Sequence, residues 1–138
     1  MTQSSCLCEA NRIFFTNKLL VRFRCHCIDE RKLTGAAFAL NILMLSKSLE
    51  ILSNSLKTWS KIAESGNTIT NHICHECGSL LFRTSDSYPK TIIIKARCID
   101  KYNAAMEYKL DVKIFTRSRI PWVAVVEGAK QEIGDFTQ

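Results

Sequence analysis

The sequence predicts a single, mainly β domain made of antiparallel sheets with short helical turns. Three observations support this class. The chain has 138 residues, 46% of them hydrophobic, which is enough for one core but not for two. Most apolar residues fall in short runs that are rich in β-branched and aromatic side chains and are separated by polar breaks. Only one short segment, 28–33, carries a clear helical pattern.

Short strands are expected along most of the chain, wherever these apolar runs occur. The runs predict strands at 13–15, 19–24, 38–45, 69–73, 80–83, 91–96 and 108–115. The last of them, YKLDVKIF, alternates apolar and polar residues, as is typical of a half-buried antiparallel strand. The predicted helix at 28–33 ends before Gly35.

Polar segments that contain glycine or proline are expected to form loops. Residues 63–68 predict one loop with Gly66 as its pivot, and residues 84–90 predict another. Trp122, which follows Pro121, is expected to anchor the core. Beyond it the chain becomes polar, so we expect one domain over residues 1–127 and a loose tail over residues 128–138.

Composition restricts the class of partner. Nineteen Lys and Arg against 13 acidic residues give a formal charge of +6, but the basic residues are scattered along the chain, which disfavours nucleic-acid binding. The longest apolar run, 35–45, is too short to cross a bilayer, and no apolar stretch follows a basic start. We therefore expect a soluble, cytoplasmic protein that acts on a small molecule away from the membrane. The sequence does not indicate its oligomeric state.

Seven cysteines provide the strongest functional signal. In the cytoplasm thiols stay reduced, so metal ligation explains these cysteines better than disulfide bonds do. Cys6 and Cys8 form a C-x-C pair, and Cys74 and Cys77 form a C-x-x-C pair. A C-x-C on a strand directs both sulfur atoms to one face, and a tight C-x-x-C turn also brings its sulfur atoms together. The four thiolates predict a structural zinc site that ties the N-terminal strand to a later hairpin.

A second C-x-C pair, Cys25 and Cys27, leads into the predicted helix. Strand geometry puts His26 on the opposite face, where packing or hydrogen bonding suits it better than metal ligation. A turn after Cys27 would bring the Glu30 carboxylate back toward the sulfur atoms, and these three side chains would then hold a second zinc with one open position. In the alternative, Glu30 is a solvated charge paired with one of the two basic residues that follow it, and the second metal is absent. Cys98 stands alone and is expected to be buried.

Four segments of the chain resemble the glutathione-dependent formaldehyde-activating enzyme family, which also includes centromere protein V. They read SCLCEA, CHCIDERKLTGAAFALN, SGNTITNHICHECGSLLF and IFTRSRIPWV, and they run in order from Ser5 to Val123. The resemblance implies a β-tent fold with two zinc ions and a carbon–sulfur lyase activity. By position it assigns Cys25 and Cys27 to two of three cysteines on a catalytic zinc. It assigns four others to the structural zinc: Cys6, Cys8, Cys74 and Cys77.

The departures from the family pattern bear mainly on the catalytic site. Glu30 occupies the place of the third cysteine. Glu9 and Arg97 each stand where glycine is usual, which predicts altered turns, and Asn71 replaces a common arginine. All four structural thiolates are retained, so the fold implied by the resemblance is less affected than the activity.

These patterns predict a zinc-dependent carbon–sulfur lyase-like enzyme for a small molecule such as a glutathione or other thiol adduct. Cys25, Cys27 and Glu30 would hold its catalytic zinc, and the carboxylate would make that zinc a stronger Lewis acid. Two alternatives remain open. One is a zinc-stabilised binding module that has lost the catalytic metal, and the other is a related enzyme with carbonyl or hydrolytic chemistry in a biosynthetic pathway.

Two segments are candidates for substrate contact. The loop SGNT offers hydrogen-bonding groups around a flexible glycine, although a simple connecting turn explains it equally well. Its residues are Ser65, Gly66, Asn67 and Thr68. The segment TRSR at 116–119 would suit an anionic substrate, although surface arginines are usually only solvated.

Overall fold

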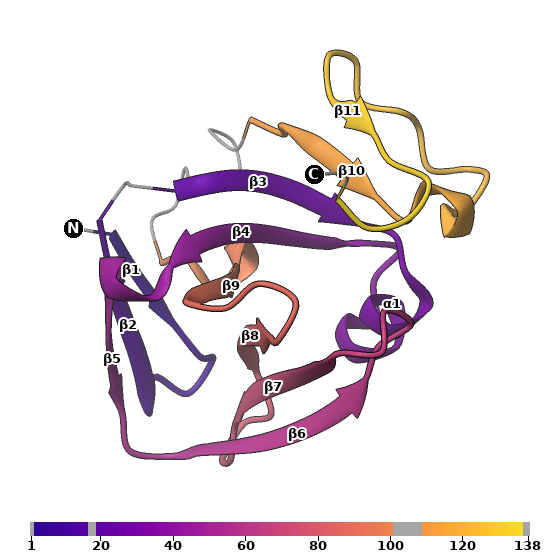
Figure 1. Cartoon of the computed structure of the whole chain (residues 1–138). Helices are drawn as coiled ribbons and strands as arrows, with labels where there is room; N and C mark the ends of the chain where they lie inside the picture. Colours follow the sequence, from indigo (N-terminus) through magenta and orange to yellow (C-terminus); the bar gives the residue numbers. More distant parts are fainter. Residues whose placement is uncertain (1, 17–18, 101–108, 137–138) are drawn as a thin grey trace.

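The structure, a computed structural model, describes residues 2–16, 19–100 and 109–136 (Figure 1). Within these residues most elements are strands, and the one α-helix is α1 (Ile28–Thr34). The strands are β1 (Thr2–Ser5), β2 (Asn11–Phe15), β3 (Leu19–Cys25), β4 (Ala39–Leu45), β5 (Leu49–Ser53), β6 (Leu56–Ile62), β7 (Thr68–Cys74), β8 (Leu80–Ser85), β9 (Thr91–Lys95), β10 (Val112–Ile114) and β11 (Lys130–Gln131). Short 3-10 helices occur at Ser46–Ser48, Ala96–Cys98 and Thr116–Ser118.

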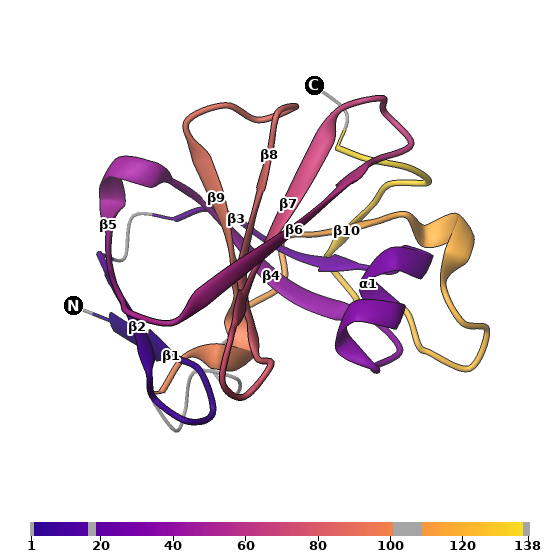
Figure 2. The same cartoon turned by 90° about the horizontal axis from the view of Figure 1, so that it is seen from below.

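The strands form two sheets, so the predicted mainly β class is confirmed. The larger sheet has the order β11-β10-β3-β4-β9-β8-β7-β6, and the smaller has the order β1-β2-β5. Neighbouring strands are antiparallel, except that β10 pairs in parallel with both β3 and β11. Figure 2 shows β6 to β9 crossing in the middle of the molecule, with β1 and β2 on one side and α1 on the other.

Two apolar clusters hold the sheets together. The first lies where the small sheet meets the large one and includes Ile13, Met44, Leu81 and Ile94, each at most 1% exposed. Burial of a side chain of this kind stabilises the fold by about 1.5–3 kcal/mol. The second cluster joins β3, β4 and β10 through Phe23, Cys25, Ala39, Leu43, Val112 and Ile114. This second cluster supports one wall of the site described below.

Helix α1 follows directly from β3 and begins at a cysteine. Cys27 is its N-cap and accepts a hydrogen bond from the backbone N–H of Glu30. At the other end, Gly35 has a φ of 68°, and its N–H donates to the carbonyl oxygen of Arg31. These two ends agree with the predicted helix at 28–33. Within the described residues, no helix is long and apolar enough to span a membrane.

The C-terminal part of the chain differs from three expectations. The segment predicted as a half-buried antiparallel strand at 108–115 contains only the short parallel strand β10, in which even Lys113 is fully buried; residue 108 lies outside the described residues. The expected loose tail is instead hydrogen-bonded: Glu132 N–H donates to the carbonyl oxygen of Lys113, and Phe115 N–H donates to that of Gly134. These bonds satisfy the edge of β10. Trp122 is 77% exposed and does not anchor the core.

Candidate functional site

Four cysteines from opposite ends of the sequence form a compact group. The Sγ atoms of Cys6, Cys8, Cys74 and Cys77 all lie within 4.8 Å of one another. The Cys6–Cys8 and Cys8–Cys74 Sγ distances are both 3.7 Å. A zinc ion with Zn–S bonds of about 2.3 Å in a tetrahedral shell requires its sulfur ligands to be about 3.8 Å apart. The four side chains therefore fit a closed zinc site, as the sequence predicted.

The local backbone explains why these sulfur atoms converge. Cys74 ends β7, and the N–H of Cys77 donates to its sulfur at 3.4 Å. Cys6 and Cys8 lie in the turn after β1 and not on the strand itself, a correction to the expected strand geometry. Glu9 closes this turn with a φ of 63°, the left-handed conformation that favours glycine. Glu9 thus adopts the backbone conformation that suits a glycine, the residue usual here in the family pattern.

The second cysteine pair lies at the junction of β3 and α1. Cys25, the last residue of β3, is 4% exposed, and its Sγ lies 3.2 Å from that of Cys27. Cys25 is the donor in this contact, and the backbone N–H of Glu30 also donates to the Cys27 sulfur at 3.3 Å. These hydrogen bonds, above all the one from Cys25, lower the pKa of Cys27, while the same contact and burial raise the pKa of Cys25. Of the two cysteines, Cys27 is therefore the one that loses its proton more readily.

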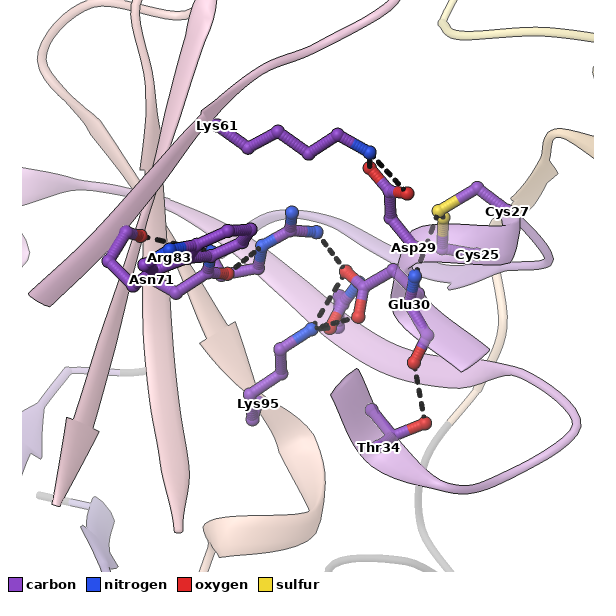
Figure 3. A network of polar contacts seen from close by, with 11 residues as sticks. Cys25, Cys27, Asp29, Glu30, Thr34, Lys61, Asn71, Arg83 and Lys95 are labelled. Atoms are coloured by element: carbon purple, nitrogen blue, oxygen red, sulfur yellow. Dashed lines mark hydrogen bonds and ion pairs between the residues drawn. The ribbon is translucent and has the colours of Figure 1, made fainter. Parts of the chain in front are cut away.

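Glu30 lies close to these sulfur atoms, but its carboxylate points into a buried ion network with Arg83 and Lys95 (Figure 3). Its side chain is 1% exposed, and its Oε1 accepts from Arg83 Nη1 at 2.5 Å and from Asn41 Nδ2 at 3.2 Å. Lys95 Nζ donates to Oε1 at 2.8 Å and to Oε2 at 2.6 Å. Burial alone would raise the pKa of Glu30, but Lys95 and Arg83 outweigh it and lower the pKa. The carboxylate is therefore ionised and fully engaged.

Because of this network, Glu30 does not fit the zinc-ligand role that the sequence suggested for it. Among the described residues, Cys25, Cys27 and Glu30 do not form a group of three ligand atoms suited to a metal. Both carboxylate oxygens face ammonium or guanidinium donors, and the 3.2 Å between the two sulfur atoms is shorter than the edge of a zinc shell, about 3.8 Å. The residues present do not fit a second zinc. Nor is Glu30 a solvated charge paired with the basic residues that follow it.

A cavity of about 760 Å³ opens beside the two thiols. Both Cys25 and Cys27 line it, together with Glu30 and Arg83. Of the candidate loop at 65–68, Ser65 lines the cavity, whereas the other three residues do not. Arg117 from the segment TRSR is also part of its wall, where the carboxylate of Glu64 is its ion-pair partner. The cavity is thus bounded by α1, by β-strands of the large sheet and by loops.

The remaining His and Cys candidates lie outside this cavity. His26 is fully buried with its ring 5.6 Å from that of Phe38, and burial together with nearby cations lowers its pKa to about 4. This neutral ring packs against Phe38, as expected. Cys98 Sγ is 3.5 Å from the carbonyl oxygen of Leu80, and burial raises the pKa of this thiol to about 11.

Sequence reasoning missed several residues that shape the site. Arg83 and Lys95 are charged residues within the strand segments LLFRTS and TIIIK, and each is less than 10% exposed. A charge inside an apolar strand was the available signal, since such a charge needs a buried partner. Tyr88 and Phe136 also line the cavity, but no local pattern distinguishes them from ordinary loop residues.

Comparisons with known proteins were made against families, curated proteins and solved structures. A family model described as glutathione-dependent formaldehyde-activating enzyme matches residues 1–118. A crystal structure of a Rhodobacter sphaeroides protein, a structural genomics target, is similar with a TM-score of 0.61 and 16% sequence identity, over 78% of this chain and 96% of that chain. At this identity the likeness concerns the fold alone. No curated protein gives a significant match.

Proposed function

Because this chain belongs to the glutathione-dependent formaldehyde-activating enzyme family, we propose that it makes or breaks a carbon–sulfur bond in a small molecule. The observation that carries the proposal is the cavity of about 760 Å³ whose wall includes Cys25 and Cys27. A cavity of this size suits a small molecule. The two thiols, already joined by a hydrogen bond, are its most reactive groups.

Zinc has a structural role in this proposal. Four thiolates close its tetrahedral shell at Cys6, Cys8, Cys74 and Cys77, so no position is left open for substrate. The ion joins the turn after β1 to the turn after β7. Its binding energy therefore contributes directly to folding.

The thiol pair supplies the proton transfers for cleavage of a hydroxyalkyl thioether. Cys27 thiolate takes the proton of the substrate hydroxyl group, and the carbon–oxygen double bond forms as the carbon–sulfur bond breaks. The electron pair of that bond leaves on the substrate sulfur, which takes its proton from the Cys25 thiol. An aldehyde and a thiol are released. A proton then passes from Cys27 back to Cys25 across their 3.2 Å contact, and the reverse sequence forms the adduct.

A catalytic zinc is not part of this mechanism. Such an ion, when bound, polarises a carbonyl oxygen as a Lewis acid. It would need a third protein ligand beside Cys25 and Cys27, and the Glu30 carboxylate is already bound to Lys95 and Arg83. The chemistry proposed here therefore depends on the thiols alone.

An aldehyde-release assay with hydroxymethyl thioethers of several thiols tests the proposal. The variants are Cys25→Ser, Cys27→Ser and, as a control outside the cavity, Cys98→Ser. We expect the first two to lose about 100-fold or more in rate, the usual contribution of general acid–base catalysis, and Cys98→Ser to keep its activity. Turnover that survives substitution of both Cys25 and Cys27 contradicts the mechanism. No turnover of any adduct, with one zinc per chain, favours a zinc-stabilised binding module instead.

A further inference from the structure

An aromatic wall forms one side of the cavity. The rings of Phe23 and Phe136 meet edge to face, with their centroids 4.9 Å apart, and the ring of Tyr88 meets Phe136 at 5.9 Å in the same manner. All three residues line the cavity. Aliphatic side chains such as Ile93 and Ile114 extend the apolar surface. A ligand placed there gains affinity by removing these side chains from water.

Phe136 comes from a segment beyond the part of the chain that matches the family model, which ends at residue 118. Backbone hydrogen bonds hold this segment against the end of β10. Phe115 N–H donates to Gly134 at 2.8 Å, and Thr116 N–H donates to Glu132 at 3.0 Å. In Figure 1 the segment, drawn in yellow, runs alongside β10. The aromatic wall is thus completed by a residue that lies outside the matched range.

The charged residues of the cavity already have partners. Lys61 pairs with Asp29 at 2.8 Å, Arg83 pairs with Glu30 at 2.5 Å, and Arg117 pairs with Glu64. A further carboxylate, Asp135, lies near Tyr88, and burial together with this carboxylate raises the pKa of the phenol, which stays neutral. Among the described residues of the wall, every lysine and arginine therefore has an acidic partner, and Glu30 also pairs with Lys95 behind the wall. Two of these ion pairs are partly exposed, but no excess of positive charge attracts an anion.

We propose that the cavity binds an uncharged small molecule whose aromatic ring lies against Phe136, and not a charged glutathione adduct. The inference rests on the proposed function in taking the cavity beside Cys25 and Cys27 as the reaction site. A glutathione adduct carries two carboxylates and one ammonium group at neutral pH. Its carboxylates would meet no free cation on this wall, whereas an aromatic ring meets a matching apolar surface.

Binding measurements with three probes test the inference on the full chain loaded with zinc. Benzyl methyl sulfide carries the ring without charge, S-benzylglutathione carries both, and S-methylglutathione carries the charges alone. Titration followed by ligand-observed NMR or calorimetry gives their dissociation constants. We expect benzyl methyl sulfide to bind at least about tenfold more tightly than S-methylglutathione, with S-benzylglutathione between them.

The matched variants are Phe136→Leu and Ile133→Ala. Leucine keeps most of the apolar packing of Phe136 but removes its ring, so benzyl methyl sulfide should bind about two- to tenfold more weakly. Ile133 is 72% exposed on the same segment, and its replacement should leave binding unchanged. Tighter binding of either glutathione compound, or equal binding to wild type and Phe136→Leu, overturns the inference. A thermal unfolding scan of each variant shows that the comparison is made between folded proteins.

Failure of this inference is distinct from failure of the proposed function, because binding requires no turnover. If benzyl methyl sulfide binds through Phe136 while no adduct is cleaved, the proposed ligand class is supported and the proposed carbon–sulfur chemistry is contradicted. In the opposite case, S-methylglutathione binds more tightly than benzyl methyl sulfide, and hydroxymethylglutathione is cleaved in a reaction that requires Cys27. The proposed chemistry is then supported and the proposed ligand class is contradicted.

Discussion

Replacing Glu30 by glutamine tests whether this carboxylate stabilises the fold or binds a metal. Glutamine keeps the shape of the side chain and removes its negative charge. Lys95 and Arg83 are 4% and 7% exposed, so both cations would remain buried without their counter-charge. Removal of one partner from a buried ion pair costs about 3–5 kcal/mol. A domain of this kind is stable by roughly 5–15 kcal/mol, so the substitution removes a large share of the total.

Chemical denaturation and metal analysis of the same samples measure both consequences. We expect Glu30→Gln to lower the free energy of unfolding by about 3–5 kcal/mol and to leave the zinc content at one ion per chain. Asp29→Asn is the matched control, one residue earlier on α1. Its ion pair with Lys61 is partly exposed, so the free energy of unfolding should fall by less than about 1 kcal/mol.

The opposite pair of results would refute this reasoning. If the wild-type protein holds two zinc ions, and Glu30→Gln loses one of them while its unfolding free energy falls no further than that of Asp29→Asn, then Glu30 is a metal ligand. In that case the ion pairs of Glu30 with Lys95 and Arg83 would not be formed in the purified protein.

Three further predictions concern pH, zinc and thiol reactivity. The folded pKa of Glu30 lies below its ordinary value of 4.5. The ionised carboxylate therefore stabilises the fold fully above about pH 4.5, and this contribution declines as the pH falls through the folded pKa. In urea titrations, the difference in unfolding free energy between wild type and Glu30→Gln should shrink below about pH 4.5. Chelator treatment, or Cys74→Ser, should remove the zinc and lower the thermal midpoint sharply, as shown by metal analysis and circular dichroism; a metal-free protein that keeps its midpoint contradicts the zinc assignment. In the zinc-loaded protein at pH 8, iodoacetamide should label Cys27 well before Cys98, whose pKa is raised to about 11. Peptide mass spectrometry gives the order of labelling, and labelling of Cys98 first contradicts the prediction.

The sequence predicted those parts of the fold that depend on local patterns. The apolar runs that become β3, β4, β7, β8 and β9 were identified within one or two residues, as was α1 with Gly35 at its end. The strands β5 and β6 were missed because most of their side chains are exposed and carry no apolar alternation. The segment around β10 was misinterpreted, since its pairing with β3 and β11 depends on residues distant in the sequence.

The same distinction applies to the candidate site. Spacing alone brought together Cys6, Cys8, Cys74 and Cys77, because short cysteine spacings fix local geometry and a metal requires several ligands. The role of Glu30 was not predictable in this way. Its partners Arg83 and Lys95 lie 53 and 65 residues away, and only the order of strands in the sheet brings them to α1. The aromatic wall at Phe136 depends equally on long-range packing.

The Glu30 network explains how the thiol pair can be positioned without a second ion. A metal bound by three cysteines would tie the end of β3 to the first turn of α1. Here Glu30 on α1 is held instead by Arg83 on β8, Lys95 on β9 and Asn41 on β4, so one buried carboxylate joins the helix to three neighbouring strands. Because Cys27 is the N-cap of that helix and receives the N–H of Glu30, fixing Glu30 also fixes the Cys27 sulfur at the wall of the cavity. Glu30, at the position where the family pattern has a third cysteine, therefore anchors α1 through ion pairs, and under the proposed function both sulfur atoms would be available to a substrate.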